Sequence, residues 1–210
     1  KEWGIKAPIN MITTMYDESL LSDFNIQNKQ LNKNILFLSR VEKAKGIYSA
    51  IDAFSEINDQ ESSFTIAGTG SEIENVKEYT KDHKIENIKF AGYVKGEEKR
   101  KIFEQASVFI LLSESEGMPI SMLEAMAFGL SVITTPVGGI RDFFEDGKMG
   151  FIAASSEIDE IVKLINILFD DSEKLKKISV FNHTYALENF SATKVAGVID
   201  KIYDQVLNPD

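Results

Sequence analysis

The chain has 210 residues, 43% of them hydrophobic, which is enough to bury the core of one ordinary globular domain. Its formal net charge of -10 argues against a nucleic-acid-binding face, which needs clustered Lys and Arg. The absence of cysteine and of any Asp-x-Asp motif, together with only two widely separated histidines, His83 and His183, argues against a protein-built metal site. We therefore expect metal-independent chemistry.

The first 33 residues differ from the rest of the chain. Polar, Asn-rich sequence over residues 25–34 separates them from the first clear strand. We predict an interdomain linker over residues 1–33 that includes an edge strand near residues 9–12. The chain opens at Lys1 rather than Met, and we expect it to be part of a longer protein.

From residue 34 onward, short apolar runs rich in β-branched residues alternate with longer segments of helical period. This pattern predicts one domain over residues 34–210 with an α/β fold, a Rossmann-like doubly wound parallel sheet of about six strands flanked by helices. The strands are predicted over residues 34–39, 63–67, 88–91, 108–112, 131–134 and 150–152.

Apolar stripes at helical spacing mark the segments between these strands. Three of the stripes are Ile47, Ile51, Phe54 and Ile57; Ile73, Val76 and Tyr79; and Ile102, Phe103 and Ala106. A short helix is predicted over residues 121–128, ended by Gly129.

A helical tail is predicted after the last strand, with two stripes that we expect to face the core. They are Ile158, Ile161, Val162, Ile165 and Leu168, and then Val195, Val198, Ile199, Ile202 and Val206. The longest apolar run, residues 108–112, is too short to span a bilayer, and we expect a cytoplasmic protein.

The residues just after the predicted strands are polar and rich in glycine. In an open parallel sheet, ligands bind in the crevice outside the carboxyl ends of the strands. Arg40 follows the first strand and Lys45 precedes the next helix, so the two cations are candidates to hold a diphosphate from two sides. The alternative is that both are solvated surface cations.

Gly68 and Gly70 follow the second strand, but Ile73 stands where a dinucleotide-binding fingerprint needs a third glycine. These two glycines either form a tight turn or let a nucleotide approach the backbone closely.

The segment 113–129 carries two glutamates eight positions apart. Glu116 lies in a Gly/Pro loop at a strand end, and Glu124 lies in the short apolar helix, where a carboxylate needs a partner. We expect Glu124 to accept hydrogen bonds, for example from a pair of ribose hydroxyls, and the N-terminus of its helix to attract phosphate. Glu78 and Glu86 have the same spacing but resemble an ordinary surface pair.

Together these motifs make the sequence resemble the C-terminal, donor-binding domain of retaining GT-B glycosyltransferases of family 4 (glycosyl transferases group 1). The matching landmarks, in family order, are Arg40 with Lys45 and Gly46, then residues 68–70 (GTG), 90–94 (FAGYV), 113–129 (SESEGMPISMLEAMAFG), 137–140 (VGGI) and 147–150 (GKMG).

The resemblance implies a site for a nucleotide sugar, UDP- or GDP-linked, which serves as co-substrate without a further cofactor. Arg40 and Lys45 would contact the diphosphate, Glu124 the ribose hydroxyls and Glu116 a hydroxyl of the transferred sugar, and we take Glu116, Arg40 and Lys45 as the catalytic candidates. The remaining donor-binding candidates act largely through backbone: Gly68, Gly70, Tyr93, Val94, Gly117, Met118, Pro119, Ile120, Ser121 and Met122.

Two departures from the family pattern stand out. Ser39 occupies a position that is usually glycine, and residues 13–17 (TTMYD) replace the usual linker signature. Family members also carry an N-terminal acceptor domain, so we expect this chain alone to be inactive and any peripheral membrane contact to come through that domain.

The function implied is retaining transfer of a hexose to a saccharide or lipid-linked acceptor, in cell-surface polysaccharide biosynthesis. The alternatives are a sugar-nucleotide epimerase of GT-B type and a non-catalytic nucleotide-binding module.

Overall fold

The computed structural model describes residues 10, 12–57, 59–155 and 157–208, and within them six strands form one parallel sheet. The strand order is β3-β2-β1-β4-β5-β6. The strands are β1 (Asn34–Leu38), β2 (Ser63–Ala67), β3 (Ile88–Gly92), β4 (Val108–Leu111), β5 (Ser131–Thr134) and β6 (Gly150–Ile152). The predicted α/β fold and all six strands are confirmed. The predicted bounds differ by one residue at three carboxyl ends, where Ser39 and Leu112 lie outside their strands and Gly92 lies inside.

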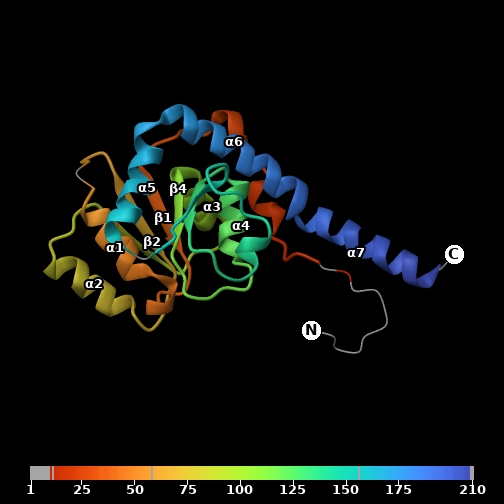
Figure 1. Cartoon of the computed structure of the whole chain (residues 1–210), viewed down its shortest axis with the longest axis horizontal. Coiled ribbons are helices and arrows are strands. Elements are labelled where there is room, and N and C mark those ends of the chain that lie inside the picture. Colours follow the sequence, from red (N-terminus) through yellow and green to blue (C-terminus); the bar gives the residue numbers. More distant parts are fainter. Residues whose placement is uncertain (1–9, 11, 58, 156, 209–210) are drawn as a thin grey trace.

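Helices cover both faces of the sheet (Figure 1). The α-helices of the described residues are α1 (Ile47–Ser55), α2 (Ile73–Asp82), α3 (Gly96–Gln105), α4 (Ile120–Ala127), α5 (Ile158–Asp170), α6 (Ser172–Asn189) and α7 (Ala192–Leu207). Short 3-10 helices occur at η1 (Glu18–Leu21), η2 (Ile26–Asn28), η3 (Lys43–Lys45) and η4 (Gly138–Asp142). Figure 1 shows α1, α2 and α5 on one side of the sheet and α3 and α4 on the other. Helix α5 packs on α1, and helix α6 packs on α4.

The core lies between the sheet and these helices. All four residues of β4 and of β5 are buried, as expected for central parallel strands that are covered on both faces. The first apolar stripe of the sequence faces the core, with Ile47 and Ile51 fully inaccessible, Phe54 nearly so and Ile57 partly buried. Phe54 packs against Phe64 of β2, with ring centroids 5.5 Å apart.

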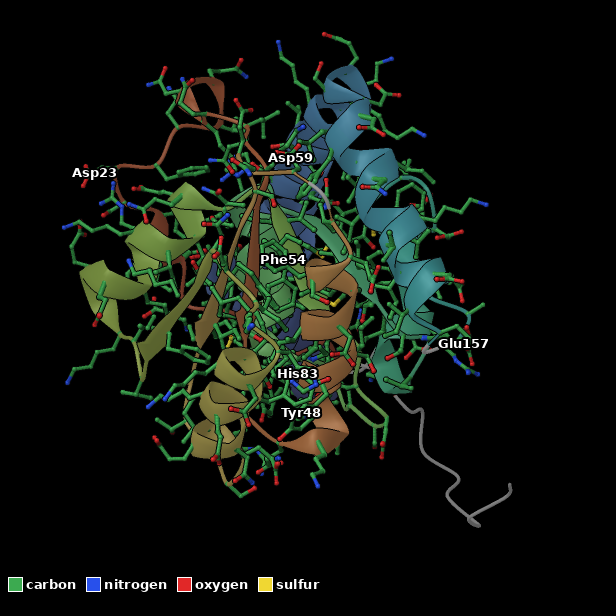
Figure 2. All side chains as sticks on the ribbon, turned by 90° about the vertical axis from the view of Figure 1, so that its left-hand side faces the viewer. Asp23, Tyr48, Phe54, Asp59, His83 and Glu157 are labelled. Atoms are coloured by element: carbon green, nitrogen blue, oxygen red, sulfur yellow. The ribbon has the colours of Figure 1, made fainter. Side chains whose placement is uncertain are left out.

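The order of the strands creates a topological switch point between β1 and β4. The chain proceeds from β1 outward to β2 and β3, and then returns to place β4 on the other side of β1. The carboxyl ends of β1 and β4 therefore flank a crevice of the kind that binds ligands in doubly wound folds. In Figure 2, Tyr48 at the start of α1 lies toward the end of the molecule that carries these carboxyl ends, whereas Asp59, just before β2, lies toward the opposite end.

The helical tail differs from the prediction in two ways. The sequence indicates no stripe for α6, because the buried face of this helix includes polar Ser179 and Asn182. The Asn182 side-chain amide donates to the carbonyls of Leu130 and Met149, each at 2.8 Å, and so ties the helix to the sheet by hydrogen bonds.

The prediction that α7 faces the core is wrong beyond its first turn. Val195 is buried, but Val198 and Val206 are 48% and 68% exposed. Figure 1 shows α7 running away from the sheet, so the later part of its stripe has no core to enter. The first tail stripe is confirmed, since Ile161, Ile165 and Leu168 of α5 are fully buried.

The N-terminal segment contacts the domain through Tyr16, among other residues. The Tyr16 side chain is buried, and its backbone N–H donates to the carbonyl of Phe190 at 3.1 Å. Of the edge strand predicted near residues 9–12, residues 9 and 11 lie outside the described residues, and residues 10 and 12 belong to no strand. None of the described helices is both long enough and apolar enough to cross a membrane.

Candidate active site at the switch point

A partly buried ion pair bridges the two sides of the crevice. The Lys45 Nζ atom, at the end of η3, lies 2.7 Å from Oε1 of Glu116, which belongs to the loop after β4. The Ser113 hydroxyl donates to the same oxygen at 2.7 Å. The Lys45 and Glu116 side chains are only 12% and 10% exposed, and the attraction between their charges offsets part of the desolvation penalty of each.

Backbone contacts fix the loop that carries Glu116. The N–H of Gly139 donates to the carbonyl of Gly117 at 2.7 Å, and the Thr135 hydroxyl donates to the carbonyl of Ser113 at 2.5 Å. Gly138 has φ +53, and a Cβ there would lie 1.7 Å from the carbonyl oxygen of Glu116. The loop after β5 thus needs glycine in order to support the Glu116 loop at this distance.

Arg40 lies beside a separate part of the crevice. It follows β1 and lines a cavity of about 260 Å³ together with Gly68, Tyr93 and Val94. Its Nη1 pairs with Oε1 of Glu42 at 2.7 Å, and its side chain is 70% exposed. Arg40 is therefore an accessible guanidinium at the mouth of the crevice rather than a member of the Lys45–Glu116 pair.

Gly68 and Gly70 are explained by contacts within the chain. A Cβ at Gly68 would lie 1.9 Å from the carbonyl oxygen of Ser39, and one at Gly70 would lie 2.3 Å from that of Val41. These glycines let the loop after β2 pass against the loop that carries Arg40. Both glycines are thus needed for this close approach of two loops, and Gly68 also lines the cavity beside Arg40.

Glu124 is buried in α4 and paired with a residue that the sequence did not indicate. Its Oε1 lies 2.6 Å from Nζ of Lys99 in α3, and Glu124 is 4% exposed. Burial raises the pKa of Glu124, and the hydrogen bond and charge of Lys99 oppose that rise. Its other oxygen, Oε2, is buried and has no hydrogen-bond partner among the described residues. Lys99 lines the Arg40 cavity, whereas Glu124 is not part of its lining.

The N-terminus of α4 lies next to the Lys45–Glu116 pair in the chain, because the helix follows directly on the loop that carries Glu116. The helix starts at Ile120, one residue before the predicted start, and no side chain of the described residues caps it at Pro119. Ile120 is 48% exposed. The Thr13 hydroxyl donates to the sulfur of Met118 at 3.0 Å, which brings the N-terminal segment against this loop. Helix N-termini carry free N–H groups and a positive dipole end that favour an anion.

The structure thus brings the predicted residues together in two groups. Lys45 and Glu116 form one, beside Gly117, Met118, Pro119, Ile120, Ser121 and Met122; Arg40, Gly68, Tyr93 and Val94 line the other. Four polar residues of these two groups could not be identified as site residues from the sequence: Lys99, Ser39 and Thr69, which line the Arg40 cavity, and Ser113, which donates to Glu116. Lys99 lies in the charged run 97–101 (EEKRK), where nothing in the sequence distinguishes it from its neighbours.

Larger cavities lie at the opposite ends of the strands. One of about 500 Å³ is lined by Asn28, Asn32 and Gln105, and one of about 430 Å³ by Asp59, His83 and Asn87. Both adjoin the amino ends of strands, away from the switch point. In the part of the chain that the structure describes, no three His, Asp or Glu side chains gather in a way that could hold a metal ion.

Comparison with known proteins identifies a family and several relatives. The family model described as "Glycosyl transferases group 1" matches residues 22–181. The chain is 26% identical over 180 residues to N-acetyl-alpha-D-glucosaminyl L-malate synthase of Bacillus anthracis, covering 85% of this chain and 47% of that protein. It is 28% identical over 190 residues to the O-antigen biosynthesis glycosyltransferase WbnH of Escherichia coli, covering 90% and 52%. The chain therefore spans about half the length of these relatives.

Solved structures show the same fold. HepE of Anabaena in complex with UDP and glucose superposes with a TM-score of 0.77 at 21% identity, covering 93% of this chain and 56% of that one. The pneumococcal O-GlcNAc transferase GtfA in complex with UDP and GlcNAc gives a TM-score of 0.71 at 23% identity, covering 97% and 40%.

Proposed function

Because the chain belongs to the glycosyl transferases group 1, we propose that it is the C-terminal, donor-binding domain of a retaining GT-B glycosyltransferase of family 4. The donor is a UDP- or GDP-sugar, and the reaction transfers its hexose to a saccharide or lipid-linked acceptor in cell-surface polysaccharide biosynthesis. The names of two similar proteins support this assignment, since WbnH acts in O-antigen biosynthesis and HepE was crystallised with UDP and glucose.

The observation that carries the proposal is the partly buried Lys45–Glu116 pair at the switch point. Cleavage of the bond between sugar and diphosphate leaves negative charge on the diphosphate and positive character on the sugar ring. A cation at the diphosphate and a carboxylate beside the sugar stabilise those two developing charges. Lys45 and Glu116 supply these opposite charges from the two sides of the crevice.

The other candidates complete the donor site. Arg40, exposed at the mouth of the crevice, contacts the diphosphate as a planar donor. The free N–H groups at the start of α4 donate hydrogen bonds to phosphate or sugar oxygens, and Glu124 recognises the ribose. Backbone around Tyr93 and Val94 meets the base. In this proposal the cations and the helix dipole stabilise the leaving group without a metal or a further cofactor.

The rest of the enzyme lies in the part of the protein that this chain does not contain. Residues 1–33 link the donor domain, residues 34–210, to an N-terminal acceptor domain, and the chain by itself does not turn over. The enzyme is cytoplasmic in this proposal, and its acceptor domain makes any peripheral membrane contact.

Titration calorimetry with UDP and GDP tests the site. We expect one of these nucleotides to bind, and Arg40→Ala to weaken its binding by roughly 1.5–3 kcal/mol, the value of a charge-assisted hydrogen bond. Lys101→Ala, which removes a 62% exposed cation from α3, is the control and should leave the affinity unchanged. Equal affinities for the wild type and Arg40→Ala would refute the role of Arg40.

The reaction class needs the longer protein with its acceptor domain. Product analysis should show transfer of the sugar only when an acceptor is present. Conversion of the free nucleotide sugar into an epimer without acceptor would overturn the assignment as a transferase.

A further inference from the structure

Lys99 lines the Arg40 cavity and pairs with Glu124, which does not line it. Its side chain is 22% exposed and lines this cavity, whereas the Glu124 side chain behind it is 5% exposed and does not. A ligand that enters beside Tyr93 and Val94 therefore reaches the ammonium of Lys99 before it reaches the carboxylate of Glu124.

The hydrogen bonds of this pair are incomplete on both sides. The Lys99 ammonium has three N–H donors, and among the described residues it donates only to Oε1 of Glu124. Oε2 of Glu124 is buried and has no partner in the same part of the chain. An ion pair that served only to neutralise a buried charge would be expected to satisfy both carboxylate oxygens. This pair instead keeps unused donors and an unused acceptor side by side.

The chain holds Lys99 in place through both ends of α3. At the C-terminal end, Nζ of Lys29 donates to the carbonyls of Phe103, Glu104 and Ala106, at 3.1, 3.3 and 2.8 Å. At the N-terminal end, Gly96 begins the helix with φ +52, directly after the Tyr93–Val94 loop. These contacts position α3, and with it the backbone of Lys99, relative to this loop.

We propose that Lys99 is a further donor-binding residue, whose ammonium donates to a ribose hydroxyl oxygen of the nucleotide while Glu124 accepts a hydrogen bond from that hydroxyl. A hydroxyl is both donor and acceptor, so it matches a paired ammonium and carboxylate. This inference rests on the proposed function, because it assumes that a nucleoside diphosphate binds in this crevice. It changes the expected recognition of ribose from a carboxylate alone to the Lys99–Glu124 pair.

The test is the discrimination between ribonucleotide and deoxyribonucleotide. Calorimetry would measure the nucleotide that binds better, UDP or GDP, against its 2′-deoxy and 3′-deoxy analogues. We expect the wild type to bind at least one analogue about tenfold or more weakly than the ribonucleotide. Lys99→Met should bind the ribonucleotide about as weakly as that analogue, and Lys99→Arg should recover part of the difference.

Lys29→Met is the matched control, because it removes another amine that contacts α3 but lies outside this cavity. This variant should lose stability and keep the discrimination of the wild type. If Lys99→Met also keeps that discrimination, or if the wild type binds both analogues as tightly as the ribonucleotide, the inference is overturned. Failure of the wild type to bind either nucleoside diphosphate would instead overturn the proposed function.

Discussion

Replacing Lys45 by methionine separates the binding role of the Lys45–Glu116 pair from its structural role. The substitution keeps most of the aliphatic side chain and removes the ammonium that lies 2.7 Å from Oε1 of Glu116. Glu116 then keeps the hydrogen bond from the Ser113 hydroxyl but loses its cation.

The structure sets the size of the two expected effects. Removing one partner of a fully buried ion pair costs about 3–5 kcal/mol of stability. The cost should be lower here, about 1–3 kcal/mol, because both side chains keep some exposure and Ser113 still donates. The affinity for a nucleoside diphosphate should fall by roughly 1.5–3 kcal/mol, or about 10- to 150-fold.

Chemical denaturation and titration calorimetry with UDP or GDP measure the two effects separately. Lys77→Met is the matched control, since Lys77 pairs with Glu74 at 2.8 Å but the two side chains are 45% and 79% exposed. This control should change stability by less than about 0.5 kcal/mol and leave binding unchanged. If Lys45→Met is destabilised but binds the nucleotide with the affinity of the wild type, the pair is structural and the argument for the active site fails.

Three further substitutions test other parts of the account. Glu124→Ala should weaken nucleotide binding in calorimetry, whereas Glu78→Ala, an exposed change on α2, should not. Equal effects of the two substitutions would contradict the inference that the surroundings of Glu124, rather than its spacing from Glu116, make it a binding residue. Gly138→Ala should lower the unfolding free energy measured in urea by more than about 2 kcal/mol, because the new Cβ would lie 1.7 Å from the carbonyl oxygen of Glu116. Gly147 also has a positive φ, +78, but a Cβ there would meet open space, so Gly147→Ala should cost only about 1 kcal/mol. Burial lowers the pKa of Lys29 to about 7, while the unfolded chain keeps that proton up to about pH 10.4. The unfolding free energy of the wild type relative to Lys29→Met should therefore rise between pH 7 and 10, by at most about 1.4 kcal/mol per pH unit, and a difference that stays constant with pH would contradict this.

The sheet could be predicted from the sequence because its strands carry a local signal. β4 is a short apolar run and β5 is rich in β-branched residues; both are buried along their whole length, and the segments that follow them are polar and rich in glycine. The carboxyl ends of parallel strands lie on one edge of the sheet, so the strand order placed Arg40, Lys45 and Glu116 near the same crevice.

The remaining features depend on contacts between distant parts of the chain. The buried face of α6 relies on the hydrogen bonds of Asn182 rather than on an apolar stripe. The apolar stripe of α7 indicates a helix but does not show whether other elements pack against it, and Val206 remains exposed. Lys99 becomes a site residue only because α3 packs next to α4, which places it against Glu124 at a sequence separation of 25.

A crystal structure of this chain with UDP or GDP would test the central claim most directly. The account predicts a nucleotide in the crevice between the carboxyl ends of β1 and β4, with its diphosphate in contact with Lys45 and Arg40. A nucleotide bound instead in a cavity at the amino ends of the strands, such as the one lined by Asn28 and Asn32, would contradict it.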